Sequence, residues 1–119
     1  MISDVYFPRV NGVSTSIQSF RQQLQALGHQ VTLIAPQYPV AYEDDADTLR
    51  IPSRYVPLDP EDRMLKRSKL LALTKQLRQQ NFDLIHIHTP FVAHYAGVEL
   101  AKRLALPVVV SYHTFFEEY

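Results

Sequence analysis

A chain of 119 residues is long enough for one domain with a modest hydrophobic core, and its 46% apolar content is that of a folded protein. A formal net charge of zero argues against a nucleic-acid binder that works through bulk positive charge. The absence of cysteine excludes disulfides and thiolate metal sites. No apolar run approaches the roughly 20 residues of a membrane span, and the polar start is unlike a signal peptide, so we expect a cytoplasmic domain.

The two ends of the chain suggest a fragment. Only Met1 to Ser3 precede turn-forming residues, whereas a typical strand has about five or six residues. The chain also stops nine residues after the buried-strand run 108–110. We therefore expect a clipped first strand and a missing continuation.

The first half of the sequence predicts one helix between strands. After a loop over residues 4–11, Ser14 or Thr15 can cap a helix. The apolar side chains of this helix recur at helical spacing: Ile17, Phe20, Leu24 and Leu27. Gly28 can end the helix, because glycine accepts the left-handed conformation. Strands are expected over 31–35 and 49–51, separated by a loop over 37–47 whose acidic side chains we expect to be exposed.

The second half repeats the alternation. It predicts the longest helix over 62–80, a strand over 84–88, a helix over 93–104 and a last strand over 108–112. Such alternation indicates an α/β fold: a Rossmann-like open, mostly parallel sheet with helices on both faces. We expect the strand order 3-2-1-4-5, with ligands bound beyond the carboxyl ends of the strands near the switch between strands 1 and 4.

Two groups of residues at those strand ends can carry chemistry. Asn11 and Gly12 form a strand-to-helix turn whose amides and helix dipole can receive a phosphate, although a plain turn is the alternative. His86 and His88 alternate on one strand and share a face, and His113 ends the next strand. A histidine there can hydrogen-bond a sugar hydroxyl or orient a reacting group. Packing is the simpler reading for His86, and no ligand spacing supports a metal site.

The segment 63–80 holds half of all the basic residues and no acid. Its leucines fit a helix that covers the sheet, with its charges as a solvated face. The basic flank can also touch an anionic membrane surface. The residues in question are Arg63, Lys66, Arg67 and Lys69.

The chain resembles the retaining glycosyltransferases of family 4, which have the two-domain GT-B fold. The resemblance rests on four stretches in the family's order: 6–14 (Tyr-Phe-Pro-Arg-Val-Asn-Gly-Val-Ser), 27–31, 82–90 and 107–114. Within the family, the opening looks most like enzymes that add glucose or mannose to lipids or lipid-linked acceptors. The chain would be the N-terminal, acceptor-side domain over residues 1–119, without the C-terminal nucleotide-sugar-binding domain.

The resemblance implies a role for particular residues. Asn11 and Gly12 match the turn that approaches the donor diphosphate, although many members have two glycines there. His113 matches the histidine at the reaction centre, while His88, Thr89 and Pro90 match an acceptor-side or cleft-lining loop. The donor is a nucleotide sugar and the acceptor a lipid or glycan hydroxyl, with no metal and no separate cofactor. The alternative is a non-catalytic α/β module that binds a ligand or a protein.

Overall fold

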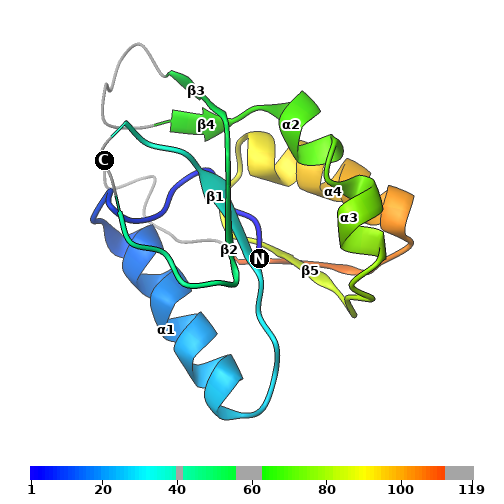
Figure 1. Cartoon of the computed structure of the whole chain (residues 1–119), viewed down its shortest axis with the longest axis horizontal. Coiled ribbons are helices and arrows are strands. Elements are labelled where there is room, and N and C mark those ends of the chain that lie inside the picture. The colour runs from blue at the N-terminus through cyan, green and yellow to red at the C-terminus, as the bar shows by residue number, and fades with distance from the viewer. Residues whose placement is uncertain (40–41, 56–62, 112–119) are drawn as a thin grey trace.

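The computed structural model describes residues 1–39, 42–55 and 63–111, with the backbone alone for 53–55 and 63–64. Figure 1 shows an α/β arrangement in which short strands lie between helices. The helices are α1 (Gly12–Ala26), α2 (Arg67–Leu71), α3 (Thr74–Arg78) and α4 (Val92–Leu104). The strands are β1 (Leu33–Pro36), β2 (Thr48–Ile51), β3 (Ser53–Tyr55), β4 (Arg63–Leu65), β5 (Ile85–Ile87) and β6 (Val108–Val110).

Parallel pairing links the strands through a single residue near the start of the chain. Strand β1 pairs in parallel with β2, and β5 pairs in parallel with β6. Ile2 forms isolated parallel bridges to both Ile34 of β1 and Ile87 of β5. The lateral order is therefore β2, β1, residue 2, β5, β6, which confirms the predicted order 3-2-1-4-5. Strands β3 and β4 form a separate antiparallel pair.

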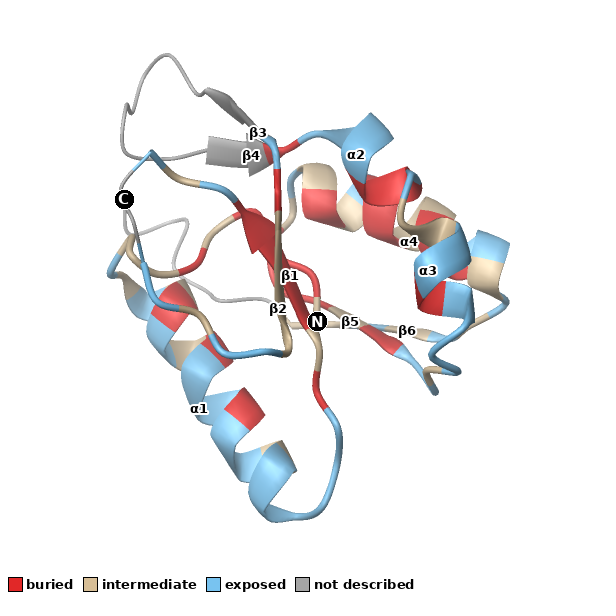
Figure 2. Ribbon diagram, in the orientation of Figure 1, coloured by how far each residue is buried: buried red, intermediate tan, exposed pale blue. Residues whose placement is uncertain are grey.

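Helices cover both faces of this parallel arrangement (Figure 2). Leu33 of β1 packs on the face of α1 with Ile17, whereas the next residue, Ile34, packs on the face of α4. This alternation follows from the two-residue period of a strand. Gly97 of α4 allows a close approach, because a Cβ there would lie 2.9 Å from the Ile87 side chain.

The first helix begins earlier than predicted. Asn11, and not Ser14 or Thr15, is the N-cap: its side-chain oxygen accepts a 2.9 Å hydrogen bond from the Ser14 amide. Ser14 lies inside the first turn, where its hydroxyl donates to the Arg9 carbonyl at 2.6 Å. Gly28 ends the helix as predicted, with a φ of +92°. Of the four apolar side chains at helical spacing, Ile17 is buried, whereas Phe20 and Leu27 are exposed.

The prediction of one long helix over residues 62–80 is wrong. Residues 63–65 form β4, and two helices of five residues each, α2 and α3, follow it. The amide of Leu65 donates a 3.0 Å hydrogen bond to the Asp4 carboxylate, which holds this residue in the strand. The Thr74 hydroxyl donates to the Leu71 carbonyl where α2 gives way to α3. Tertiary contacts therefore override the local helical period.

The predicted cover of the sheet is nevertheless confirmed for three leucines. Leu70, Leu71 and Leu77 are buried in the core cluster that includes α4 and β5.

Across the three described ranges, no helix has both the length and the apolar character needed to cross a membrane.

We predict that stability depends on the ionisation of the Met1 amine. Burial, reinforced by the charge of Arg21, lowers the pKa of this amine from 8.0 to about 5. Between these values the unfolded chain binds a proton that the folded chain does not, so stability rises with pH across pH 5–8. The gain is at most about 1.4 kcal/mol per pH unit. Urea unfolding at several pH values measures it.

The matched control is the same chain with an acetylated α-amine, which removes this titration and leaves every histidine in place. Its stability should rise less steeply over the same interval. Equal slopes for the two chains would contradict the assignment to Met1.

Candidate functional site

The loops that follow the first strand and β5 meet at the carboxyl edge of the parallel strands. Asp4 follows the first strand and Thr89 follows β5. The Asp4 amide donates to the Thr89 hydroxyl oxygen at 2.9 Å, and the Thr89 hydroxyl donates to the Asp4 carboxylate at 2.7 Å. This edge is where an α/β sheet of this kind binds its ligands.

The Asp4 carboxylate joins three separate segments of the chain. Besides Thr89, it accepts hydrogen bonds from the amide of Leu65 at 3.0 Å and from the amide of Ala93 at 2.9 Å. The side chain is fully buried. Burial raises the pKa of Asp4, while the three hydrogen bonds act to lower it. No local pattern in the sequence singles out Asp4, because its partners lie 61–89 positions away.

The turn at Asn11 and Gly12 starts α1 and faces open space. The Asn11 side chain is used as the helix cap, so it supports the turn from within. Gly12 is exposed, and a Cβ added there would meet no atom within 4 Å. The first turn of a helix favours an anion through its amides and its dipole. The turn therefore has room for a ligand, and its role toward a donor diphosphate stays a prediction.

His86 and His88 lie on one face, as their alternation predicts. The His86 and His88 rings are 4.0 Å apart between centroids, and both contact the ring of Phe20 from α1. His86 Nε2 also lies 2.7 Å from the Ser111 hydroxyl, which suits a packing role. His88 and Thr89 are buried and Pro90 is half-buried, so their role as a cleft-lining loop stays a prediction. His113 lies outside the described residues.

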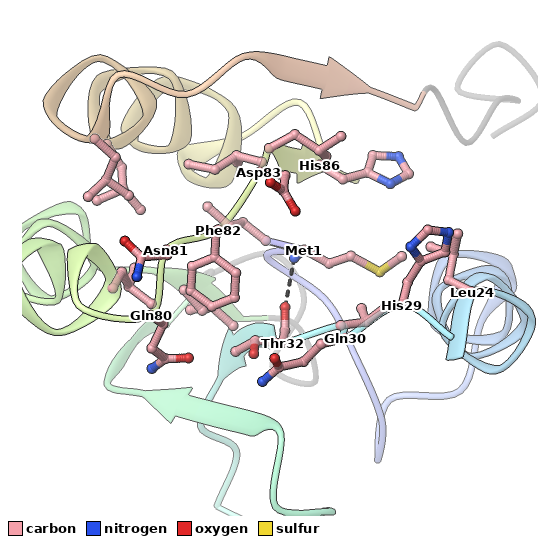
Figure 3. Close-up of a pocket in the computed structure, with 18 residues that line it drawn as sticks. Met1, Leu24, His29, Gln30, Thr32, Gln80, Asn81, Phe82, Asp83 and His86 are labelled. Atoms are coloured by element: carbon pink, nitrogen blue, oxygen red, sulfur yellow. Dashed lines mark hydrogen bonds between the residues drawn. The ribbon is translucent and has the colours of Figure 1, made fainter. Parts of the chain in front are cut away.

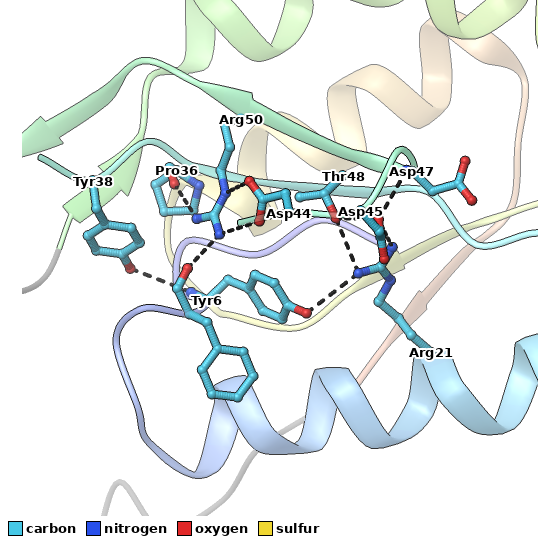
Figure 4. Close-up of polar contacts among 10 residues, drawn as sticks. Tyr6, Arg21, Pro36, Tyr38, Asp44, Asp45, Asp47, Thr48 and Arg50 are labelled. Atoms are coloured by element: carbon cyan, nitrogen blue, oxygen red, sulfur yellow. Dashed lines mark hydrogen bonds and ion pairs between the residues drawn. The ribbon is translucent and has the colours of Figure 1, made fainter. Parts of the chain in front are cut away.

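Arg50 fastens the loop that precedes Gly12 (Figure 4). Its guanidinium makes two hydrogen bonds to Asp44, at 2.8 and 2.9 Å, and also donates to the carbonyls of Phe7 at 2.6 Å and Pro36 at 2.9 Å. The ring of Tyr6 lies 5.4 Å from the guanidinium carbon. One cation thus ties β2, the end of β1 and the loop over residues 4–11 together.

Arg21 of α1 makes a second, similar connection. This buried side chain bonds to Asp45 at 3.2 Å and to the hydroxyl of Thr48 at 3.3 Å. Burial acts to raise the pKa of Asp45, but hydrogen bonds from Thr48 and Arg21 outweigh it and hold the pKa below its usual range. The expected exposure of the acidic loop is therefore wrong for Asp44, whose side chain is 19% exposed, and is confirmed for Asp45, which stays 56% exposed while it pairs with Arg21.

The basic segment is partly neutralised within the fold. Arg67 pairs with Glu99 of α4, at 2.7 Å to one carboxylate oxygen, and its hydrogen bond lowers the pKa of Glu99. Lys66 and Lys69 are exposed. Arg63 lies in β4, and its side chain is outside the described part of the structure. The described residues contain no cluster of three or more histidine or carboxylate side chains that could hold a metal ion.

We predict that Asp4→Asn destabilises the fold by about 1–3 kcal/mol. The amide group of asparagine would place N–H donors against at least one of the donors that now meet a carboxylate oxygen. The free energy of unfolding in urea measures the loss. The control is Asp83→Asn at an exposed aspartate, which should change it by less than about 0.5 kcal/mol. Similar values for the two variants would contradict the role of Asp4.

We also predict that Arg50→Lys lowers the free energy of unfolding by about 1.5–3 kcal/mol. Lysine keeps the positive charge but lacks the planar guanidinium that makes several hydrogen bonds at once. Arg67→Lys is the matched control, since Arg67 also meets a carboxylate but is 60% exposed. That control should cost no more than about 1 kcal/mol. Both are read from urea unfolding, and an equal cost would show that burial adds nothing at Arg50.

The sequence is similar to known glycosyltransferases along its whole length. The alpha-monoglucosyldiacylglycerol synthases of Acholeplasma laidlawii and Streptococcus pneumoniae are 32% and 34% identical, and each alignment covers 100% of this chain. The GDP-mannose-dependent alpha-mannosyltransferase of Mycobacterium tuberculosis is 32% identical over 96% of it. The chain spans 30%, 27% and 31% of these three relatives, respectively. The comparison with solved structures gives no match.

The model of one family matches residues 10–119, which is most of the chain. The matched range includes Asn11, Gly12 and the segment that follows β5. The chain therefore belongs to Glycosyltransferase Family 4.

Proposed function

We propose that the chain is the Rossmann-like N-terminal half of a GT-B enzyme. In its natural-length form, the protein would transfer a hexosyl group, glucose or mannose, from a nucleotide sugar to a lipid or glycan hydroxyl with retention of configuration. The observation that carries the proposal is the similarity over 96–100% of the chain to both glucosyl- and mannosyltransferases. The strand order, with helices on both faces, supports the Rossmann-like layout.

In this proposal the turn at Gly12 receives the donor diphosphate. The amides at the start of α1 stabilise the charge that develops on the leaving group as the sugar departs. The open space in front of Gly12 supports this role, since a phosphate can approach the backbone closely there. Asp4 and Arg50 act on the same turn from within, because both hold the loop that leads to it.

The remaining roles concern the acceptor and the reacting sugar. His113 positions the donor sugar, and the loop of His88, Thr89 and Pro90 lines the acceptor side. Closure of a C-terminal domain over this edge would exclude water, so that transfer competes with hydrolysis. Lys66 and Lys69, exposed beside β4, would favour peripheral contact of a cytoplasmic enzyme with an anionic membrane.

The experiment that tests the activity incubates the natural-length protein with a panel of nucleotide hexoses and a membrane-lipid extract. Mass spectrometry then looks for a lipid that has gained one hexose. A product with one donor supports the proposal and identifies both substrates. Donor hydrolysis without a lipid product would move the acceptor to a soluble molecule, and no donor consumption would favour the non-catalytic binding module.

We predict that Gly12→Ala lowers transfer activity without lowering the stability of the fold. The added methyl group meets nothing within 4 Å, so the unfolding free energy should stay the same or rise by up to about 1 kcal/mol. Transfer by the natural-length enzyme should nevertheless fall by about 10²-fold, because the methyl group displaces the donor. Ser19→Ala, exposed on the same helix, should leave both quantities unchanged. Full transfer activity in Gly12→Ala would remove this turn from the donor site.

A further inference from the structure

The segment between β1 and β2 carries two side chains that bear on Phe7, in the loop that leads to Gly12. The ring of Tyr42 stacks on the ring of Phe7, with 5.9 Å between the centroids and 18° between the planes. The Asp44 carboxylate accepts two hydrogen bonds from the Arg50 guanidinium, which also donates to the Phe7 carbonyl at 2.6 Å. Both the ring and the carbonyl of Phe7 are therefore held from the β2 side of the sheet.

The position of the Arg50 guanidinium depends on its surroundings. Its central carbon lies 5.4, 6.0 and 5.7 Å from the ring centroids of three tyrosines: Tyr6, Tyr38 and Tyr42. The faces of aromatic rings attract a guanidinium, whose N–H groups donate within its own plane. Asp44 completes this environment (Figure 4), and the paired side chains are only 15% and 19% exposed. We call Tyr42, Asp44 and Arg50 the Phe7 clamp.

Hydrogen bonds connect the Phe7 clamp to the first turn of α1. The carbonyl of the residue before Phe7 accepts a 3.1 Å hydrogen bond from the Arg9 amide. The Arg9 carbonyl accepts from the Ser14 hydroxyl at 2.6 Å, and the Ser14 amide donates to the Asn11 side chain at 2.9 Å. Because Asn11 directly precedes Gly12, a displacement of Phe7 would be passed on to the Gly12 turn.

We propose that Tyr42 and Asp44 are positioning residues of the donor site, which act on the Gly12 turn through Phe7. This inference rests on the proposed function, in which that turn receives the donor diphosphate. Neither side chain has to touch the donor. Their contribution is to keep the amides at the start of α1 where negative charge develops on the leaving group.

This role predicts a loss of turnover and not a loss of donor binding. In the proposed function the C-terminal domain holds the nucleotide, whereas the Gly12 turn meets charge that appears only as the sugar departs. Loss of an interaction made in the transition state alone lowers kcat and kcat/KM equally, so that KM is unchanged. A merely structural role would instead lower the Tm and leave the turnover of the folded enzyme intact.

The first part of the test measures kcat and donor KM for variants of the natural-length enzyme. Tyr42→Ala should lower kcat at least about 10-fold and leave KM within about 2-fold of the original value. Because Tyr42 is 43% exposed, this variant should still fold, which its Tm checks. Tyr42→Phe keeps the ring and should retain full kcat.

Asp44→Asn keeps the size of the side chain and removes its charge, so it should also lower kcat, by about 10-fold. The matched control is Glu43→Gln, which removes a carboxylate from the exposed neighbouring residue. That control should leave both kcat and KM unchanged. Equal effects of the two substitutions would show that the charge of the segment matters and the Phe7 clamp does not.

Amide hydrogen exchange in the same proteins tests the Phe7 clamp without any assay of transfer. The reporters are hydrogen-bonded amides in the loop and in the first turn of α1: Arg9, Ser14 and Thr15. They should exchange at least about 10-fold faster in Tyr42→Ala and in Asp44→Asn, and at the original rate in Glu43→Gln. The amides in the middle of α4 should exchange as before, whereas a general loss of stability would accelerate them too.

The two measurements separate the ways in which the proposal can fail. Unchanged exchange of the reporter amides in Tyr42→Ala would show that the Phe7 clamp does not hold the turn. Faster exchange with full kcat would overturn the positioning role while leaving the clamp as a structural contact. An unsubstituted enzyme that transfers no hexose would contradict the proposed function, and the donor role of the clamp with it.

Discussion

The buried carboxylate of Asp4 is the constraint on which the carboxyl edge of the sheet depends. A carboxylate that is buried away from water needs hydrogen-bond donors around it. Leu65, Thr89 and Ala93 supply these donors from three segments of the chain. The Ala93 amide belongs to the first turn of α4, where the helix dipole also favours a negative charge. β4, the loop after β5 and the start of α4 are therefore placed relative to the first strand by one side chain.

Arg50 completes this arrangement from the other side of the same loop. Asp4 fixes the beginning of the loop toward α4, and Arg50 fixes its middle at the Phe7 carbonyl toward β2. The loop then ends at Asn11, whose side chain caps α1. The Gly12 turn is held by these three contacts, none of which uses an atom of Gly12 itself. Its backbone can meet a ligand while the fold remains supported by its neighbours.

The sequence predicted the features that depend on local pattern and on general rules of α/β sheets. The helix over 93–104, the stop at Gly28 and the strand order were all confirmed, because periodicity and right-handed crossovers determine them. The prediction of a helix over 62–80 was wrong because the Leu65 amide donates its hydrogen bond to the carboxylate of Asp4, 61 residues away. Asp4 and Arg50 themselves were missed for the same reason, since no local spacing reveals a partner so distant.

The first strand links the two halves of the parallel arrangement, and its two ends are supported very differently. Within the part of the chain that the structure describes, residues 1–3 join β1 to β5 through backbone hydrogen bonds. At the carboxyl end this strand continues into Asp4 and its three donors, whereas at the amino end it borders a cavity lined by both apolar and polar side chains (Figure 3). Because the loops after the first strand and β5 both begin at this junction, the geometry of the Gly12 turn depends on how firmly that strand is held.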